Sequence, residues 1–338
     1  MLPKLAITMG DPAGVGPEVV VGALAVPAVA AVCQPVVVGD LDTLRRAARI
    51  VGISAELRPL AEVEDTASHP GIIAVLQPPR LEVTRVHQGQ VSAAAGRAAH
   101  DCIVEATRLA LAGEMDAVVT APIHKESLRA SGCPHPGHTE LLASLTGALQ
   151  VAMMLVAGSL RVSHVTTHLA LRQACERVRQ ERVLQVIRLT HQAVVRMGVR
   201  RPHIAVAGLN PHAGEGGLFG REEIDEISPA IRSAQAEGID AAGPYPPDTV
   251  FYLATQAAGP GRPPMDAVVA MVHDHGHIAV KLMGFMEGVN LTLGLPIIRT
   301  SPDHGTAFDK AGKGTADPSS MVQAILLAAR MAKGQRER

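Results

Sequence analysis

Short runs of apolar, often β-branched residues recur along the chain, and segments with apolar positions at helical spacing separate several of them. The runs predict strands at Leu5–Met9, Pro35–Val38, Ile72–Leu76, Ala117–Thr120, Val151–Val156, Leu160–Val165, His203–Leu209 and Ala267–Val272. The helical spacing predicts helices at Ala93–Leu111, Glu181–Met197, Ile224–Glu237 and Ser319–Met331. Strands that are apolar nearly throughout and alternate with helices are typical of an α/β fold with a largely parallel sheet covered on both faces.

Composition and charge narrow the class of protein. With 338 residues, the chain is long enough for one large α/β unit or for two lobes that each bury a core. It has four Phe, two Tyr and no Trp, so stacking platforms for single-stranded nucleic acid are not expected. The formal net charge is −1 without a basic tract, which argues against binding to a phosphate backbone.

Cysteines and apolar stretches indicate the compartment. Four cysteines lie far apart without a CxxC pair, which favours reduced thiols over a disulfide framework or a zinc ribbon. The N-terminus lacks the cleavage region of a signal peptide. The longest apolar stretch, residues 19–33, is interrupted by Pro27 and is too short to span a bilayer. We therefore expect a cytoplasmic protein without a membrane partner.

Residues suited to chemistry collect directly after the predicted strands. Gly, His, Asp and Pro are concentrated at residues 9–18, 121–125, 166–168, 209–215 and 273–281. In open α/β sheets, ligands bind outside the carboxyl ends of the strands. Several of these loops are therefore expected to meet at one cleft.

Three histidines in these loops are candidate metal ligands. His168 lies in VTTHLALR, His212 in GLNPHAGEGG and His273 in AMVHDHGH. They are too far apart for a local zinc motif, so only the fold could bring them together. Neutral imidazoles favour borderline cations such as Zn²⁺, Co²⁺ or Mn²⁺, and three ligands leave positions open for substrate. A lone histidine is more often a hydrogen-bonded loop or core residue.

Other segments point to anion binding. In GHTELL a helical pattern begins at Glu140, so Thr139 is expected to cap a helix whose N-terminus attracts an anion; plain capping is the alternative. A glycine-punctuated, strand-like region contains Lys281, Asn290 and Arg299. Its two cations are candidates for binding a phosphate or carboxylate; the alternative is that they are solvated surface charges.

Two glycine-rich segments stand at opposite ends of the chain. Residues 301–318, SPDHGTAFDKAGKGTADP, allow the backbone to approach a ligand closely, but they match neither GxGxxG nor a Walker A loop. Residues 10–18, GDPAGVGPE, form a turn after the first strand, and glycine spacing of this kind is weak evidence for a nucleotide site.

Taken together, the motifs resemble one family over nearly the whole chain. The chain is similar to the 4-hydroxythreonine-4-phosphate dehydrogenases, which belong with the isocitrate and isopropylmalate dehydrogenases. The similarity runs from about residue 5 to residue 330. It is carried by MGDPAGVGPE, TAPIHKESL, GHTELL, TTHLALR, GLNPHAGEGGLFG, PPDTVF, HDHGHIAVK and GVNLTLGLPIIRTSPDHGTAFDKAGKG.

The resemblance implies a two-lobed α/β/α fold with a cleft between the lobes and an obligate homodimer that shares its active sites. Residues 1–125 and 300–338 would form the NAD-side lobe, and residues 126–299 the metal, substrate and dimer-forming lobe. It further implies a divalent metal (Zn, Co, Mn or Mg) on His168, His212 and His273, with His273 expected from the second subunit. Substrate contacts are implied for His138, Thr139, Lys281, Asn290 and Arg299.

The same resemblance implies NAD as the cofactor. By analogy with the wider group, the adenosine site would involve His304, Gly305, Thr306, Ala307 and Asp309, and Asp309 suits the ribose hydroxyls of NAD. The reaction would be oxidation of a secondary alcohol with the metal as Lewis acid, followed by loss of CO₂ from the β-keto acid. Lys125, Asp248 and Asp274 are the candidate acid and base groups, in no fixed order.

Two histidines bear on the substrate. His275 stands where the family more often has glutamine, and His277 is more similar to a branch that oxidises 4-phospho-D-threonate or 4-phospho-D-erythronate. These acids carry a hydroxyl at C2, where 4-phosphohydroxy-L-threonine, the substrate in pyridoxal phosphate biosynthesis, carries an amine. We favour the branch that oxidises 4-phospho-D-threonate or 4-phospho-D-erythronate, and keep oxidation of 4-phosphohydroxy-L-threonine as the alternative.

Three other readings explain less of the sequence. A three-histidine zinc hydrolase gives no role to residues 301–318. A non-catalytic sensor of phosphorylated metabolites would more naturally carry a DNA-binding or signalling appendage. A plain α/β scaffold leaves the histidine loops unexplained.

Overall fold

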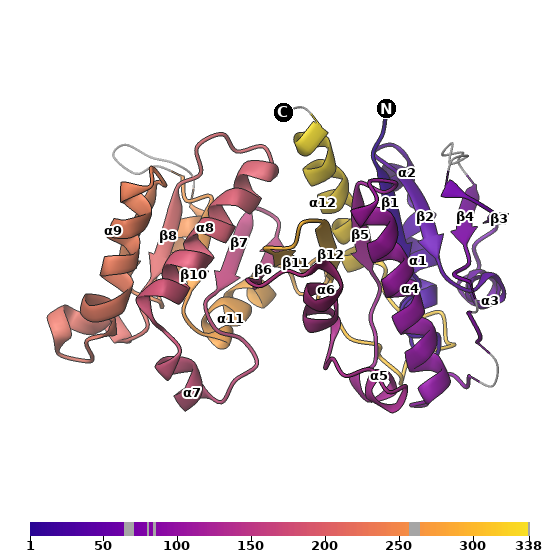
Figure 1. Ribbon diagram of the computed structural model, residues 1–338, viewed down its shortest axis with the longest axis horizontal. Coiled ribbons are helices and arrows are strands. Elements are labelled where there is room, and N and C mark those ends of the chain that lie inside the picture. Colours follow the sequence, from indigo (N-terminus) through magenta and orange to yellow (C-terminus); the bar gives the residue numbers. More distant parts are fainter. Residues whose placement is uncertain (64–70, 80, 84–85, 257–263, 337–338) are drawn as a thin grey trace. The chain divides into compact units, whose positions relative to one another are not determined.

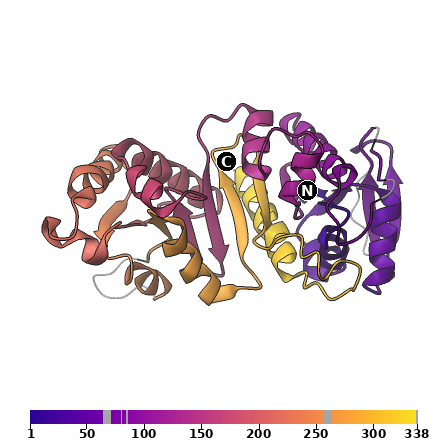
Figure 2. The ribbon, with the colours of Figure 1, turned by 90° about the horizontal axis from the view of Figure 1, so that it is seen from below.

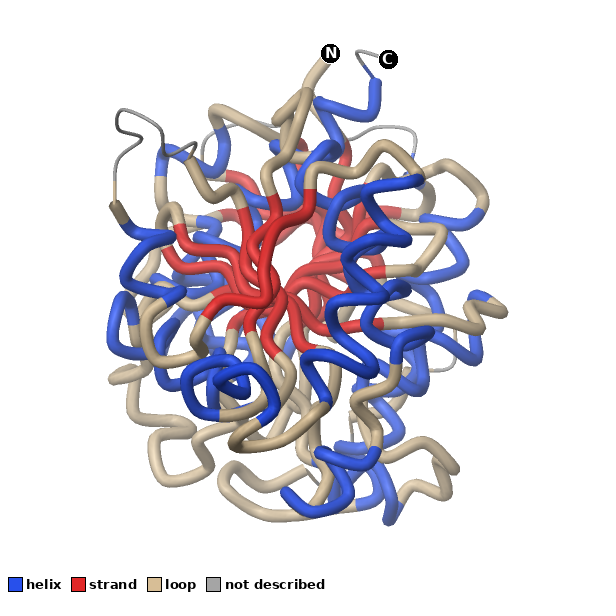
Figure 3. Tube along the Cα trace, turned by 90° about the vertical axis from the view of Figure 1, so that its left-hand side faces the viewer, coloured by secondary structure: helices blue, strands red, loops and turns tan. Residues whose placement is uncertain are grey.

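The computed structural model describes residues 1–63, 71–79, 81–83, 86–256 and 264–336. The chain forms two compact units, one made of Met1–Leu149 with Leu295–Arg338 and one made of Gln150–Gly294. In both units the strands lie inside a cover of helices and loops (Figure 3). Within the described residues, no helix is both long and apolar enough to cross a membrane.

The first unit is built on a parallel sheet with the strand order β3-β4-β2-β1-β5-β12. Its strands are β1 (Lys4–Thr8), β2 (Gln34–Val38), β3 (Glu56–Leu60), β4 (Ile72–Leu76), β5 (Ala117–Thr120) and β12 (Ile298–Pro302). Leu5 and Ile7 of β1 are completely buried, and burial of each such side chain contributes about 1.5–3 kcal/mol.

The helices of the first unit cover this sheet (Figure 1). They are α1 (Gly16–Leu24), α2 (Pro27–Ala30), α3 (Leu41–Ile50), α4 (Ala93–Leu111), α5 (Lys125–Ala130), α6 (His138–Thr146) and α12 (Ser319–Arg336). The long helix α12 packs against β12 and β5, as Figure 2 also shows, and α4 packs against β1, β5 and β2. Ser92 caps α4, because its hydroxyl accepts a hydrogen bond from the N–H of Ala95.

The second unit contains a mixed sheet with the strand order β11-β6-β7-β10-β8-β9. Its strands are β6 (Ala152–Ala157), β7 (Leu160–His164), β8 (Ile204–Ala207), β9 (Ala241–Tyr245), β10 (Ala267–Ala270) and β11 (Val289–Leu293). The pairs β11–β6 and β6–β7 are antiparallel, whereas the pairs β7–β10, β10–β8 and β8–β9 are parallel.

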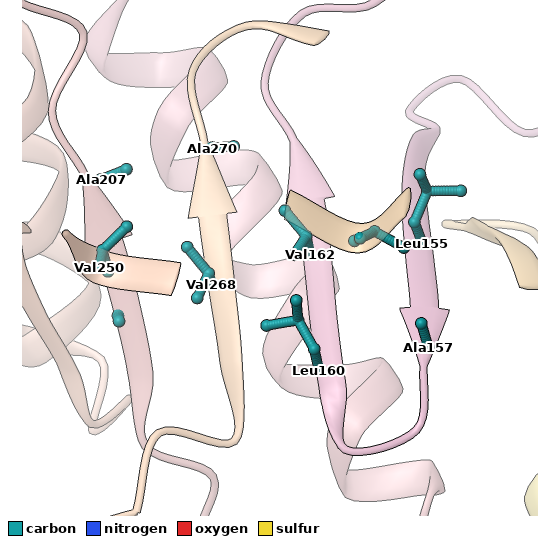
Figure 4. Close-up of a cluster of buried hydrophobic side chains, with 10 residues drawn as sticks. Leu155, Ala157, Leu160, Val162, Ala207, Val250, Val268 and Ala270 are labelled. Carbon is teal, nitrogen blue, oxygen red and sulfur yellow. The ribbon is translucent and has the colours of Figure 1, made fainter. Parts of the chain in front are cut away.

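Helices and short turns complete the second unit: α7 (Leu171–Glu176), α8 (Gln180–Arg196), η2 (Pro211–Gly217), η3 (Glu223–Ile227), α9 (Ser228–Ala236), α10 (Val250–Thr255) and α11 (His273–Gly284). One core cluster, drawn in Figure 4, joins side chains of β6, β7, β8 and β10 to Val250 of α10 and Val280 of α11. This packing holds α11 against the sheet at Val280.

The α/β architecture with mostly parallel strands confirms the fold class predicted from the sequence. Each predicted strand and helix is present, and α4, β4 and β5 have the predicted bounds. Four strands were missed: β3, β9, β11 and β12. Of these, β3 alternates exposed and apolar positions, and β9 contains glycine and proline, so neither has the continuous apolar run that the prediction used.

The compact units have other boundaries than the predicted lobes. Residues 126–149 and 295–299, which we expected in the second lobe, belong to the first unit. The physical reason is local packing: α5 and α6 lie on α4, and β12 pairs with β5. Helices α4 and α5 approach so closely that a Cβ at Gly96 would clash with the carbonyl oxygen of Ser127.

Candidate active site

The three candidate metal ligands follow neighbouring parallel strands of the second unit. His168 comes after β7, His273 begins α11 after β10, and His212 lies in η2 after β8. Because β10 pairs in parallel with both β7 and β8, the carboxyl ends of all three strands lie at one edge of the sheet. The topology therefore brings the three histidines to the same edge.

Two of these histidines have unusual backbone conformations. His168 has a φ of 20° and His212 a φ of 53°, and Ala213 and Glu215 beside His212 are also at positive φ. For residues other than glycine such conformations cost on the order of 1–3 kcal/mol each and cluster at functional sites. Both imidazoles are on exposed residues. The strained loops thus present the two rings to solvent instead of packing them into the core.

The donor set suits a metal, but one chain does not complete a three-ligand cage. The ring centroids of His168 and His273 are 5.8 Å apart, and the ring of His212 lies 6.3 Å from that of Phe219. Across the described part of the chain, no group of three or more His, Cys, Asp or Glu is placed to hold a metal ion. By their chemistry, neutral imidazoles fit a divalent cation such as Zn²⁺.

A second set of histidines lies around His273, and one of them, His164, was not among the residues predicted from the sequence. The rings of His273 and His277 are stacked with centroids 3.5 Å apart, and Nδ1 of His277 lies 3.0 Å from the carbonyl oxygen of His273. The ring of the fully buried His164 lies 4.7 Å from that of His277. Gly276 permits this contact, because a Cβ there would clash with Nε2 of His164.

Burial keeps these inner imidazoles neutral. Desolvation, followed by the nearby charge of His277, lowers the pKa of His164 to about 3. Desolvation, followed by the charge of His273, lowers the pKa of His277 to about 4. His164 ends an apolar strand, so the pattern alone gave no reason to single it out; its place beside the HDHGH motif comes from the packing of α11 on β7.

The candidate acid and base groups are spread over both units. Asp274, on α11, is exposed, and its Oδ1 lies 2.6 Å from Nδ1 of His273; this hydrogen bond lowers the pKa of Asp274. Asp248 lies exposed in the turn before α10. Lys125 is the exposed first residue of α5 in the first unit. These positions leave the choice of base among them open.

The helix of the candidate anion-binding segment starts two residues earlier than predicted. Helix α6 begins at His138, its N-cap is Gly137, and the cap has no side-chain hydrogen bond. Our expectation that Thr139 caps this helix is therefore wrong, because Thr139 already lies within the first turn. Without a capping side chain, the first N–H groups of α6 remain available to an anion.

Arg299 is the buried cation of this region. Only 2% of Arg299 is exposed, and its Nε and Nη2 donate to Oγ1 of Thr120 at 3.1 Å and 2.6 Å. Burial lowers the pKa of Arg299 to about 9, which leaves it protonated at neutral pH. Nε2 of His138 is buried without a hydrogen-bond partner in the described structure, and desolvation together with the charge of Arg299 lowers the pKa of His138 well below its ordinary value. The sequence had not indicated Thr120.

The remaining substrate candidates lie in the second unit. Lys281 is exposed on α11, with Nζ 5.9 Å from the ring centroid of Phe285. Asn290 is half-buried in β11, opposite Leu155 of β6. Both lie in the unit that carries the histidines, whereas His138, Thr139 and Arg299 lie in the other.

The candidate cofactor loop is anchored to the N-terminal glycine-rich turn. The carbonyl oxygen of Thr306 accepts from the N–H of Val15 at 3.0 Å. The buried carboxylate of Glu18 accepts from the N–H groups of Gly312 and Gly314 at 2.6 Å and 3.0 Å. The two segments singled out separately in the sequence therefore form one structure.

The predicted cofactor residues differ in exposure. Thr306 is buried, His304 is half-buried with Nδ1 3.0 Å from the carbonyl oxygen of Gly305, and Asp309 is exposed. Ala307 has a φ of 39°, another strained non-glycine position. An exposed Asp309 beside a strained turn is available to a ligand's hydroxyl groups.

Two further groups flank this loop and were not anticipated. The rings of His124 and Phe308 stack with centroids 4.4 Å apart. Asp11 is completely buried, and its Oδ1 accepts from the N–H of Ala13 at 2.8 Å. Desolvation raises the pKa of Asp11.

The chain is thus an α/β protein with a histidine cluster in one unit and a buried cation, Arg299, in the other. Comparison with protein families gives a match over residues 31–328 to the pyridoxal phosphate biosynthetic protein PdxA. The chain therefore belongs to the PdxA family, which confirms the resemblance stated from the sequence.

Relatives with two different names are almost equally similar to the chain. It is 47% identical to a D-threonate 4-phosphate dehydrogenase of Pectobacterium atrosepticum, over 97% of this chain and 99% of the relative. It is 48% identical to a 4-hydroxythreonine-4-phosphate dehydrogenase of Beijerinckia indica, over 97% of this chain and 94% of the relative. A crystal structure of a 4-hydroxythreonine-4-phosphate dehydrogenase from Klebsiella pneumoniae is similar with a TM-score of 0.90 and 46% identity, covering 98% of each chain.

Proposed function

We propose that this protein is an NAD-dependent, metal-assisted dehydrogenase that oxidises the C3 hydroxyl of a 4-phosphorylated hydroxy acid and decarboxylates the product. The observation that carries the proposal is the buried guanidinium of Arg299, set against His138 at the uncapped N-terminus of α6. A buried cation next to free N–H groups is suited to a phosphate dianion. The names of the relatives agree with such a substrate.

In this proposal the two units supply different contacts. Arg299, His138 and Thr139 bind the phosphate, because they combine a charge, an imidazole and a helix N-terminus in the first unit. Lys281 and Asn290 of the second unit bind the rest of the substrate. The loop with Thr306 and Asp309 holds NAD, and Glu18 keeps that loop in place.

The oxidised end of the substrate would lie at the histidine edge. His168, His212 and His273 would hold a divalent cation there, and their neutral imidazoles match its ligand preference. When bound, such a cation supplies Lewis-acid stabilisation of the charge that develops on the substrate oxygen, and NAD accepts the hydride. Lys125, Asp248 and Asp274 remain the candidates for taking the alcohol proton and returning a proton after CO₂ loss.

We further propose a homodimer that shares this site, with His273 contributed by the second copy. Helix α11, which starts at His273, exposes an unusual number of large apolar side chains for a surface helix. They are Ile278, Leu282, Met283 and, directly after the helix, Phe285 and Met286. Contiguous exposed apolar side chains mark interaction surfaces. A face of this kind next to an incomplete metal site fits a shared active site.

For the substrate we favour 4-phospho-D-threonate or 4-phospho-D-erythronate. The degree of identity does not separate the two branches, since relatives of both names are about equally similar. His277 favours the sugar acids. Its ring stacks on that of His273, which in this proposal places it at the oxidised end of the substrate. The alternative is 4-phosphohydroxy-L-threonine and a role in pyridoxal phosphate synthesis. The cytoplasm, where NAD is present, is the expected compartment.

The test is NADH formation by the metal-replete protein with 4-phospho-D-erythronate, 4-phospho-D-threonate and 4-phosphohydroxy-L-threonine in parallel. Turnover of the first two supports the favoured branch, and preference for the third supports the alternative. If no phosphorylated acid reduces NAD, the dehydrogenase proposal is wrong. Exchange of His277 for leucine should shift the preference if this residue reads the C2 substituent.

A further inference from the structure

The hydroxyl that holds the buried guanidinium of the first unit comes from a residue far away in the sequence. Thr120 and Arg299 are separated by 179 positions, yet Oγ1 of Thr120 accepts from both Nε and Nη2 of Arg299. Thr120 is the last residue of β5 and is completely buried. The contact is therefore part of the interior of the first unit.

Strand geometry explains why these side chains meet. Strands β5 and β12 are parallel neighbours, with Arg299 in register with Val118. Side chains two positions apart on a strand share a face, so Thr120 lies on the same face as Val118 and Arg299. The next residue, Thr300, faces the other way and donates its hydroxyl to the carbonyl oxygen of Ala324 in α12. Arg299 consequently points away from α12, toward the face where its charge acts on His138.

A long, flexible arginine gains most from such a restraint. Its recognition of phosphate depends on the orientation of a planar fork of donors, which a free side chain loses through rotation. A buried hydroxyl that accepts from one side of the fork restricts this rotation before the substrate arrives. Small errors in the placement of binding groups are costly for catalysis.

We propose that Thr120 is a positioning residue for phosphate recognition: its hydroxyl fixes the orientation of the Arg299 guanidinium against the phosphate of the substrate. This inference rests on the proposed function, because it needs Arg299 to bind phosphate. It adds to that function a residue that does not itself touch the substrate.

The chain supplies a matched control for this proposal. Thr8 of β1 is the direct cross-strand neighbour of Thr120, and both residues are completely buried. The hydroxyl of Thr8 has no hydrogen-bond partner in the described structure, whereas that of Thr120 has two. Thr120→Val and Thr8→Val therefore alter the same face of the sheet, but only Thr120→Val removes a contact with Arg299.

The experiment compares Thr120→Val, Thr120→Ser and Thr8→Val with the parent in the metal-replete holoenzyme. Thr120→Val removes both hydrogen bonds to the Arg299 guanidinium, so we expect KM for the phosphorylated acid to rise at least about tenfold, the effect of losing one hydrogen bond to a charged group, with kcat changed much less. The inhibition constant for inorganic phosphate should rise in parallel. Thr120→Ser keeps the hydroxyl and should restore both values, and Thr8→Val should leave both unchanged.

The outcomes separate this inference from the function on which it rests. An active parent with an unchanged KM in Thr120→Val overturns the positioning role and leaves the dehydrogenase intact. An equal rise in Thr8→Val also overturns it, because the effect would then come from the sheet face and not from the contact with Arg299. A parent that oxidises no phosphorylated acid refutes the proposed function, and this inference with it.

Discussion

The two units hold their candidate site residues in opposite ways. In the first unit, Arg299 and Glu18 are buried, and each is held by hydrogen bonds to groups far away in the sequence. In the second unit, His168 and His212 lie exposed on loops with left-handed backbone. The candidate residues of the first unit are thus buried in its interior, whereas those of the second unit are exposed.

The difference follows from the cost of burying charge. A guanidinium or carboxylate inside a protein must have hydrogen-bond partners, because an unsatisfied buried charge costs several kcal/mol. The first unit supplies those partners itself. An uncharged imidazole carries no such cost, so the second unit can leave the rings of His168 and His212 exposed. Substitutions in the first unit should therefore affect stability and binding together, and those in the second unit should affect binding alone.

The largest expected effect separates metal binding from folding. His212→Ala should lower metal affinity and turnover at least about 100-fold, since even groups behind metal ligands are worth 10–100-fold. Its free energy of unfolding should stay close to that of the parent, because the imidazole ring is exposed and the backbone keeps the same strained conformation. Metal content by elemental analysis, NADH formation and chemical denaturation measure these effects. His191→Ala on α8 of the same unit is the control, and unchanged turnover in His212→Ala would contradict the ligand assignment.

Arg299→Lys tests the buried candidate residues of the first unit. Lysine keeps the charge but loses the fork and the bond from Nε to Thr120, so KM for the phosphorylated acid should rise roughly 10- to 150-fold, as expected for 1.5–3 kcal/mol. Because the site is buried, the free energy of unfolding should fall as well. KM measured with phosphorylated and dephosphorylated acids distinguishes the roles. If both change alike, Arg299 does not recognise phosphate.

Glu18→Gln should have a moderate effect on both stability and cofactor binding. The amide keeps one acceptor oxygen, but its NH₂ group cannot accept, so one of the two bonds from Gly312 and Gly314 is lost at a cost of about 1–3 kcal/mol. Chemical denaturation should show the loss, and KM for NAD should rise because the loop with Thr306 loosens. Glu126→Gln, exposed on α5, serves as the control. A stable variant with unchanged KM for NAD would show that the loop is held by other contacts.

The smallest effect concerns the pH dependence of stability. Burial raises the pKa of Asp11 from its ordinary value of 3.8, so above pH 3.8 the native state binds more protons at this site than the unfolded state does. Stability therefore falls as the pH rises from 3.8 through the raised pKa. Asp11→Asn keeps the acceptor for Ala13 and cannot ionise, so it should lack this fall. Unfolding free energies of both proteins across this range measure the difference, and parallel curves would exclude a raised pKa.

Much of the fold was open to prediction because it depends on local patterns. The apolar runs of β1, β5 and β10 and the spacing in α4 identify these elements, since each is buried along a whole run or stripe. The edge strand β3 was missed because most of its positions are exposed, and the edge strand β9 because glycine and proline interrupt its apolar run. Thr139 was misassigned as a cap because helix starts depend on backbone geometry, here on Gly137, more than on residue type.

For the candidate site, the sequence by itself determined which residue types are present and in which loops they lie. His168, His212 and His273 follow apolar strands, and that placement is visible in the sequence because strand ends carry the ligand loops of α/β proteins. The tertiary structure alone decided the partnerships. Thr120 meets Arg299, and Glu18 meets the glycine-rich loop, because parallel strands and packed helices bring together residues far apart in the chain. The local pattern of residues carries no information about such pairs. Their hydrogen bonds stabilise the protein only after the sheet has formed and water is excluded around them.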